Sequence, residues 1–356
     1  MFHPFVLICS LGYLFVFLSI LSPNKKREIL FFAILLILIV LADGLRWEMG
    51  IDWKSYKKMF DTGLMPGVEF GFRRYVQLIS SFSSEYSIFI FISALIIYFG
   101  NLIILYKDTN SLLAVSFVLS ILPWYSGSMR QFIATAFVSA AFVALTKSNK
   151  KNFIFLILLG SIFHISAFLL IPLIFMYGAS PIIIFIIFIL CFPITVYLFN
   201  FLGSLGQMLD FLFASEKDFT HHLGNDQQVN PLLGTLRKLY SLTLPFFITV
   251  FSPKLLSNKK IVFYGGISIF TFVVYFLGIN YMQILSSRLD YYFSVLALSF
   301  LIGHVDKSIT RKSNKIFLAI FVISLSVVSY TRMTEYSLFY PYSSIFYNEN
   351  LERELY

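Results

Sequence analysis

Long apolar stretches alternate with short polar segments along the whole chain. The apolar stretches run for roughly 17–25 residues, the length at which a helix crosses about 30 Å of hydrocarbon. Backbone amides cannot stay unpaired in lipid, and no segments alternate in the manner of barrel strands, so the pattern predicts an all-α, polytopic transmembrane helical bundle. The predicted spans, about eleven in number, are 4–22, 28–45, 86–106, 111–126, 129–146, 152–176, 181–200, 238–252, 261–279, 288–304 and 315–332.

The composition agrees with a membrane protein built as one domain. The chain is 58% hydrophobic and only 13% charged, and the charged share is about half of what a soluble domain carries. No linker rich in proline or serine and no fixed-period repeat divides the spans. Residues 1–356 are therefore predicted to form a single integral membrane domain.

Lysine and arginine gather in short loops, and this gives the orientation. Short basic loops face the cytoplasm, and they lie at 25–27, 107, 147–151, 254–260 and 307–315. The segments between them are then extracytoplasmic: the N-terminus, the large loop 43–85, the turns 126–130 and 280–288, and the C-terminal tail 334–356. The protein is expected in the bacterial cytoplasmic (inner) membrane.

One stretch breaks this alternation, because three passes are found between two cytoplasmic loops where an even number is required. Either 152–177 is a re-entrant or broken helix with Gly160 to Ile165 at its tip, or 201–214 adds a partial pass. We favour the first solution, because the tip is polar and Pro172 follows, and irregular backbone is tolerated at depth only inside protein. Both solutions place the loop 201–236 outside.

The net charge of +9 does not indicate nucleic acid as a partner, because the basic residues lie mostly in the short loops that set topology. Cys9 and Cys191 are far apart within apolar stretches, so neither a disulfide nor a metal site is expected.

Charge concentrates in residues 43–74. This segment holds eleven Asp, Glu, Lys and Arg side chains, whereas the whole chain has 27 basic and 18 acidic residues. A membrane protein that gathers charge beside an apolar segment typically handles a charged or sugar-like substrate there. The segment is therefore the first candidate for the functional site.

The first motif of this segment runs from Arg46 through Gly50 and Asp52 to Tyr56. Asp52 is placed to cap a short helix over about 53–61, and Tyr56 lies one turn further on. In the plain interpretation Asp52 is only a cap, Arg46 meets lipid headgroups, and the tryptophans of the motif are interfacial anchors. In the functional interpretation a carboxylate and a guanidinium face a common substrate groove.

Two further arginine motifs follow. Glu69 stands between Gly67 and Gly71, which permit a close backbone approach, and Arg73 follows them; both charged side chains could also be plain solvated surface. Arg130 occupies the first turn of a helix, where a cation opposes the helix dipole. This unfavourable position predicts an anionic partner from elsewhere in the chain.

His164 and Arg288 complete the candidates. His164 lies inside an apolar segment, where an ionisable group marks either a functional site or a contact with a neighbouring helix. No ligand stands at metal-binding spacing from it. Arg288, at the external start of a span, either pairs with Asp290 or projects into the same cavity as the other arginines.

Motifs for nucleotide or metal chemistry are absent from the sequence: it has no P-loop, no Asp-x-Asp pair and no His-Glu-x-x-His. Several arginines on the outer face fit a pyrophosphate bound without metal, because guanidinium groups match phosphate oxygens in bidentate fashion. No cofactor is expected.

The motifs, taken in order, resemble the EpsG-like branch of the Wzy-type O-antigen and capsule polymerases. The resemblance covers residues 40–175 by motif and the rest by hydropathy; it rests on Arg46, Gly50-x-Asp52-x-x-x-Tyr56, Glu69 with its glycines, Arg130-Gln131-x-x-Ala134 and Phe163-His164-x-Ser166-Ala167.

The resemblance implies a metal-independent glycosyltransferase that joins undecaprenyl-pyrophosphate-linked oligosaccharide units into O-antigen or capsule chains on the outer face of the membrane. Donor and acceptor are then both lipid-linked, and a chain-length regulator protein is a conceivable further partner. Our hypothesis assigns Arg46, Arg130 and Arg288 to the pyrophosphate, Asp52, Glu69 or His164 to catalysis, and Tyr56, Gln131 and Arg73 to the sugars.

Two rivals remain. A flippase or other transporter of lipid-linked oligosaccharide would carry charge along a transmembrane path and have related halves, whereas charge here collects on one face. A membrane-bound acyltransferase would need a cytoplasmic donor site, whereas the candidate residues map outside.

Overall fold

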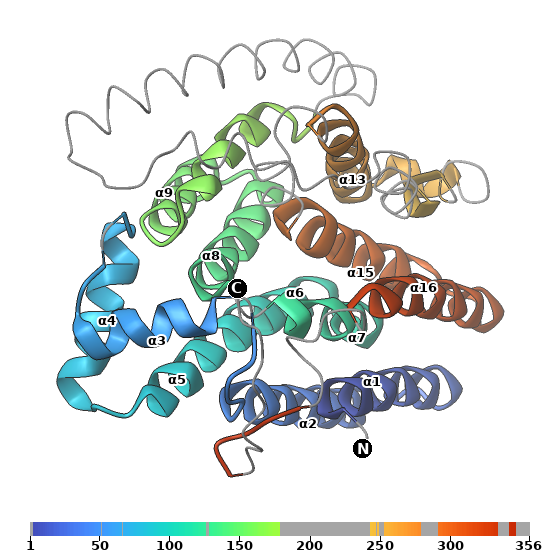
Figure 1. Ribbon diagram of the computed structural model, residues 1–356. Coiled ribbons are helices and arrows are strands. Elements are labelled where there is room, and N and C mark those ends of the chain that lie inside the picture. The colour runs from blue at the N-terminus through green and yellow to red at the C-terminus, as the bar shows by residue number, and fades with distance from the viewer. Residues whose placement is uncertain are drawn as a thin grey trace. The chain divides into compact units, whose positions relative to one another are not determined.

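Helices make up nearly all of the computed structural model (Figure 1), which describes residues 3–50, 52–65, 67–125, 128–178, 243–246, 248, 253–278, 291–333 and 342–346. Within these residues there is no strand, and the one β-bridge is an isolated antiparallel pair between Arg46 and Ser344. The all-α fold class is therefore confirmed.

The chain divides into two compact units. Unit 1 comprises Met1–Leu64, Glu69–Phe168 and Ile302–Tyr356, and unit 2 comprises Met65–Val68 and Leu169–Leu301. The prediction of one domain over residues 1–356 stays a prediction.

The helices of unit 1 are α1 (Pro4–Leu21), α2 (Lys25–Gly44), α3 (Trp53–Thr62), α4 (Phe70–Phe82), α5 (Tyr86–Tyr98), the π-helical turn Phe99–Ile103, α6 (Ile104–Thr109), α7 (Leu112–Ile121), the 3₁₀ turn Leu122–Tyr125, α8 (Met129–Thr146), α9 (Lys150–Ser161) and α16 (Lys312–Met333). The 3₁₀ helix Ile165–Phe175 and α15 (Leu298–Ser308) begin in one unit and end in the other.

Side-chain caps fix several helix starts. A cap accepts a hydrogen bond from a backbone N–H that the first turn leaves unpaired. His3 caps α1, which continues with Pro4, a residue suited to the first helical position. The other side-chain caps of this kind are Asn24 for α2, Ser111 for α7 and Asn149 for α9.

Three helices in the described part of the chain are long and apolar enough to cross a membrane: α1, the continuous helix Tyr86–Thr109, and α8. All three coincide with predicted spans. The predicted span 111–126 is shorter as an α-helix, because the chain changes to a 3₁₀ turn at Leu122, just before Pro123. The count of about eleven spans stays a prediction.

The helices of unit 1 pack side by side. Helix α1 lies against α2, α7 and α16, α2 also lies against α5, and α5 packs on α8, which pairs with α9 (Figure 1). The core is aliphatic and aromatic, with buried phenylalanines on α5, α7 and α8.

Segments predicted on the cytoplasmic side contact one another at one end of unit 1. Lys25 Nζ, at the start of α2, donates to Asn110 Oδ1 after α6 at 2.9 Å. Lys312 Nζ, at the start of α16, donates to the carbonyl of Leu21 at the end of α1, at 3.4 Å.

Segments predicted outside also contact one another. The Tyr342 hydroxyl donates to the Ala42 carbonyl at the end of α2, at 2.7 Å, and the rings of Tyr342 and His3 are 5.6 Å apart. The grouping of loops thus agrees with the predicted topology. Which group faces the cytoplasm stays a prediction.

The expected break within 152–177 is present. Helix α9 ends at Ser161, and a 3₁₀ helix that contains Pro172 begins at Ile165. Whether this segment is re-entrant stays a prediction, and the alternative at 201–214 lies outside the described residues, as does loop 201–236.

Unit 2 contains the 3₁₀ turn Pro253–Ser257, α13 (Lys259–Gly278) and the π-helical segment Tyr291–Ala297. Helix α13 packs on the π-helical segment, and the rings of Tyr264 and Phe300 stack at 5.1 Å.

Candidate functional site

The charged segment after α2 folds as two short amphipathic helices. Helix α3 buries Trp53, Tyr56 and Phe60, which recur at helical spacing. It ends at Thr62 and is capped by Gly63, whose φ of 67° is left-handed. The predicted helix over 53–61 is therefore confirmed.

Trp53 is not an interfacial anchor. It is 5% exposed, and its ring meets those of Trp47 and Tyr86 at 5.2 and 5.5 Å. Helix α4 adds Phe72 to the same aromatic cluster, which reaches Phe89 on α5. Aromatic pairs of this kind give about 0.5–1.5 kcal/mol beyond their burial. The cluster holds α3 and α4 against α5.

Arg130 has the anionic partner that its position at the start of α8 predicted. Its Nη1 lies 2.6 Å from Glu69 Oε2, and the two side chains are only 15% and 17% exposed. Charge-assisted bonds of this length are about twice as strong as neutral ones, and low exposure protects the pair from screening by salt. The pair joins α8 to the start of α4.

Glu69 is held from a second side. It occupies the N-cap position of α4 without making a capping bond, and its Oε1 accepts from the backbone N–H of Ile165 at 3.4 Å. Two residues on, the N–H of Gly71 donates to the Ile162 carbonyl at 2.8 Å. The start of α4 is thus seated on the turn after α9, and this turn positions the Glu69 carboxylate.

Tyr56 is the third member of the network. Its hydroxyl accepts from Arg130 Nε at 3.4 Å, and the side chain is buried. Burial raises the pKa of Tyr56 to about 12, and the nearby Asp52 carboxylate adds to this rise, while Arg130 opposes it. Tyr56 therefore stays a neutral phenol at physiological pH.

Replacing Tyr56 by Phe should lower activity without changing its pH dependence. One long bond to a charged group is lost, which costs about 1 kcal/mol or about fivefold in rate. Because the pKa lies well above 10, the phenol contributes no ionisation between about pH 6 and 9. The measurement is the pH–rate profile, in membranes, of the polymer formation that the sequence resemblance implies; a limb that disappears in Tyr56→Phe would contradict the prediction.

Asp52 stands at the N-cap position of α3, but its side chain makes no capping bond there. Instead, Asp52 Oδ2 lies 3.5 Å from the hydroxyl of Ser128, which donates to it. Ser128 directly precedes α8 and lies two residues before Arg130. The interpretation of Asp52 as only a cap is therefore wrong for its side chain, which turns toward the start of α8.

His164 lies in the turn that receives Glu69. It is buried, and its Nδ1 accepts from the backbone N–H of Ser166 at 3.3 Å and lies 2.7 Å from the Ser166 hydroxyl. Because Nδ1 accepts, the neutral ring carries its proton on Nε2. His164 is thus arranged as a hydrogen-bond donor, which disfavours its use as a base.

Arg46 forms a separate buried pair. Its Nη1 bonds Asp43, one turn earlier, and both side chains are 2% exposed. Its backbone pairs with the C-terminal segment 342–346: Trp47 N–H donates to the Ser343 carbonyl at 3.0 Å, and Ile345 N–H donates to the Leu45 carbonyl at 3.0 Å. In this conformation Arg46 directs its charge to Asp43, and the contact with pyrophosphate stays a prediction.

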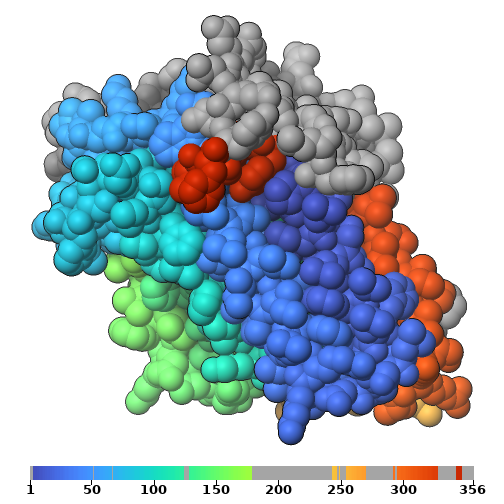
Figure 2. Space-filling view, turned by 90° about the horizontal axis from the view of Figure 1, so that it is seen from below, coloured from blue at the N-terminus to red at the C-terminus, as the bar shows by residue number. Residues whose placement is uncertain are grey.

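The segment 342–346 lies across the start of α1 and the end of α2. Figure 2 shows it, in red, lying over the blue N-terminal helices. Tyr342 contacts the rings of His3 and Phe5, at 5.6 and 6.1 Å. The far end of the chain thereby fixes the loop that begins at Arg46.

The remaining candidates are placed differently. Gln131 is buried on α8 next to Arg130, and Arg73 is exposed on α4. Arg288 lies outside the described residues. Their roles in binding stay predictions, whereas Asp52, Tyr56, Glu69 and Arg130 are brought together, with His164 in the adjoining turn.

Sequence reasoning missed the supporting groups. Asp43 could have been found, because it stands three residues before Arg46, the spacing of neighbours on a helix. Ser128 and the N–H of Ile165 carry no such signal: each belongs to a turn whose partner lies at least 76 residues away in sequence.

Comparison with known proteins gives one match. The model of the EpsG family matches residues 28–344. No curated protein and no solved structure matches the chain.

Proposed function

The chain belongs to the EpsG family, a family of polysaccharide polymerase-like membrane proteins, and we propose that it joins lipid-linked oligosaccharide repeat units into long chains. In this proposal both substrates carry undecaprenyl pyrophosphate, the products are O-antigen or capsule chains, and the reaction occurs on the extracytoplasmic face of the inner membrane. No metal takes part.

One observation carries the proposal: Arg130 is held at the start of an apolar helix by groups from two helices of the charged segment. Glu69 and Tyr56 orient the guanidinium, with Nη1 on one and Nε on the other. A fixed, poorly solvated guanidinium stabilises negative charge that develops on a leaving pyrophosphate. Such a group suits a transferase whose donor departs as an anion.

The bond changes are those of a glycosyl transfer. A hydroxyl of the incoming unit attacks the anomeric carbon of the growing chain, the bond from that carbon to pyrophosphate oxygen breaks, and the hydroxyl proton passes to a base. Arg130 receives the departing pyrophosphate, to which Arg46 and Arg288 are further candidate ligands. Tyr56, Gln131 and Arg73 are assigned to the sugars.

The base in this proposal is a carboxylate. Pyrophosphate oxygens compete with Glu69 for Arg130, and the Glu69 carboxylate released from this ion pair accepts the hydroxyl proton while Ile165 N–H still holds it in place. Asp52 is the second carboxylate beside the start of α8. His164, whose Nδ1 accepts from Ser166, serves better as a hydrogen-bond donor to a sugar.

The deciding experiment compares surface polysaccharide in the parent strain, in a strain that lacks this protein, and in a complemented strain. Loss of a polymerase leaves single repeat units on the lipid anchor outside the cell, and this is the expected result. A strain with no repeats outside would indicate a flippase, and an unchanged ladder would indicate an acyltransferase or another role. Either of these results overturns the proposal.

A further inference from the structure

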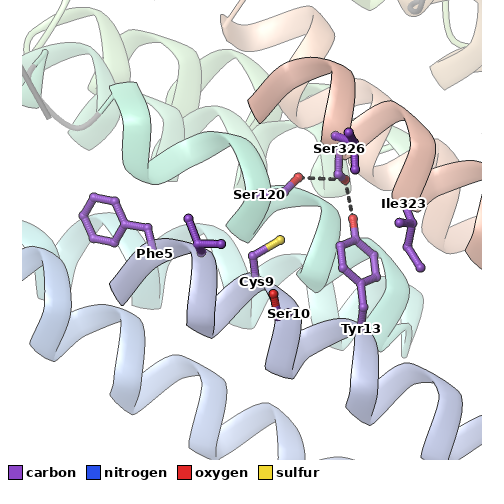
Figure 3. A pocket seen from close by; sticks show the side chains of 9 residues that line it. Phe5, Cys9, Ser10, Tyr13, Ser120, Ile323 and Ser326 are labelled. Carbon is purple, nitrogen blue, oxygen red and sulfur yellow. Dashed lines mark hydrogen bonds between the residues drawn. The ribbon is translucent and has the colours of Figure 1, made fainter. Parts of the chain in front are cut away.

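A groove opens between α1, α7 and α16, and no part of the proposed mechanism uses it. Figure 3 shows its walls, and its volume is about 170 Å³. The residues that line this α1–α7–α16 groove are Phe5, Val6, Cys9, Ser10 and Tyr13 of α1, Ser120 of α7, and Ile323, Ser326 and Val327 of α16.

Three hydroxyl groups of the groove, those of Tyr13, Ser120 and Ser326, are hydrogen-bonded within the protein. Tyr13 is hydrogen-bonded to Ser326, and the Ser120 hydroxyl lies 2.9 Å from the Ser326 hydroxyl (Figure 3). The Ser120 hydroxyl also donates to the Phe117 carbonyl at 2.7 Å. These hydroxyls therefore require no polar ligand. The rest of the groove surface is mainly hydrocarbon and aromatic. Such a surface favours an apolar occupant.

The groove opens to the outside of the protein along α1, a helix that is long and apolar enough to span a membrane. Val327, which lines the groove, is 53% exposed, and Leu7 and Leu14, which do not line it, are 51% and 52% exposed on the outside of α1. In a bilayer such a mouth meets lipid, so the occupant is a hydrocarbon chain. An apolar cavity of about 150 Å³ holds one benzene molecule, so this one suits roughly one five-carbon isoprene unit.

The groove lies at the end of unit 1 that carries the candidate site. Phe5, in its wall, contacts Tyr342 of the segment that pairs with Arg46. Ser120, in its floor, is in the last turn of α7, and the chain then runs through the 3₁₀ turn toward Arg130. A lipid whose charged head is bound near these arginines would bring the first units of its chain to this groove.

We infer that the α1–α7–α16 groove binds isoprene units next to the pyrophosphate of a polyprenyl-linked substrate. The inference rests on the proposed function for the identity of the lipid. In this inference α1 and α16 bind the lipid chain, and the charged segment 43–74 binds the head group.

The test is photo-crosslinking of the full-length protein in vesicles of phosphatidylethanolamine and phosphatidylglycerol that contain undecaprenyl pyrophosphate. A small diazirine amino acid replaces Val6 in the groove wall or, as a matched control, Leu14 on the exposed face of the same helix. We expect undecaprenyl adducts enriched at position 6, whereas position 14 should sample lipids in proportion to the bilayer. If the ratio of undecaprenyl adducts to phospholipid adducts is equal at the two positions, the groove binds ordinary acyl chains and the inference is overturned.

Filling the groove gives a second readout. Cys9→Phe, or the smaller Cys9→Leu if the first variant is not recovered in the membrane, should raise KM for the lipid-linked donor with little change in kcat. The effect should be about threefold to tenfold, because a polyprenyl chain displaced into lipid finds surroundings as apolar as the groove. Leu14→Phe should leave KM unchanged, and an unchanged KM in both Cys9 variants would contradict the inference.

The crosslink measures binding and does not depend on turnover. Enrichment at position 6 together with an unchanged polysaccharide ladder in the deletion strain would reject the polymerase and keep the lipid groove. Single repeats in that strain without enrichment would keep the polymerase and reject the groove.

Discussion

Arg130→Lys should abolish long polysaccharide chains and leave single lipid-linked repeats, with normal amounts of protein in the membrane. The guanidinium contacts Glu69 and Tyr56 through two different nitrogens. A lysine ammonium is a single point charge and cannot reproduce this fork. Loss of one donor to a developing oxyanion typically costs about 10²–10³ in rate, which is sufficient to remove the long chains from a ladder.

The control is Arg74→Lys. Arg74 is exposed on α4, and its Nη1 donates to Gln77 within the same helix at 3.1 Å. This substitution should leave the ladder unchanged. The measurement is gel separation of surface polysaccharide beside an immunoblot of membranes. A normal ladder in Arg130→Lys would show that a positive charge at position 130 suffices, and it would remove the guanidinium fork to Glu69 and Tyr56 from the mechanism.

The same arginine illustrates what a sequence can and cannot predict. A cation in the first turn of a helix opposes the dipole, so its need for an anionic partner could be predicted without coordinates. The identity of the partner could not, because Glu69 lies 61 residues away and reaches Arg130 through the packing of α4 on the turn after α9. The need of a charged side chain for a partner can be predicted from the residues next to it in sequence. The identity of that partner depends on how the helices pack.

The fold, too, has features that the sequence predicts and features that it does not. Apolar length predicted α1, α8 and the helix Tyr86–Thr109, because crossing hydrocarbon imposes a minimum length. Periodicity did not predict that Arg46 would be buried, or that its backbone would pair with Ser344, almost 300 residues later in the chain. Contacts between chain ends of this kind leave no local pattern.

The second substitution with a large expected effect is at a glycine. Gly71→Ala should abolish polymer formation, although residue 71 has no side chain that could take part in the reaction. A Cβ at this position would lie 2.7 Å from the carbonyl oxygen of Ile162 and 2.9 Å from its Cγ1. The closest atom belongs to the backbone, so α4 or the turn after α9 must move, and overpacking of this kind typically costs about 1–3 kcal/mol.

The substitution would displace the start of α4, which carries Glu69. Gly71 N–H donates to Ile162, and this contact seats the start of α4, where Glu69 holds Arg130. A shift of about 1 Å at a catalytic group can cost about 10²-fold in rate. The expected result is therefore single lipid-linked repeats, as in Arg130→Lys, from a variant whose charged residues are all intact.

Gly160→Ala is the matched control on the same turn. Its Cβ would lie 3.4 Å from the Ala134 carbonyl and from Phe137 Cβ, which is ordinary contact, and alanine favours a helix over glycine by about 1 kcal/mol. This variant should keep its ladder and its amount in the membrane. If Gly71→Ala also keeps a normal ladder, the seating of α4 does not position Glu69 for catalysis. If only Gly71→Ala fails while its amount is normal, the fault lies in the geometry between Glu69 and Arg130.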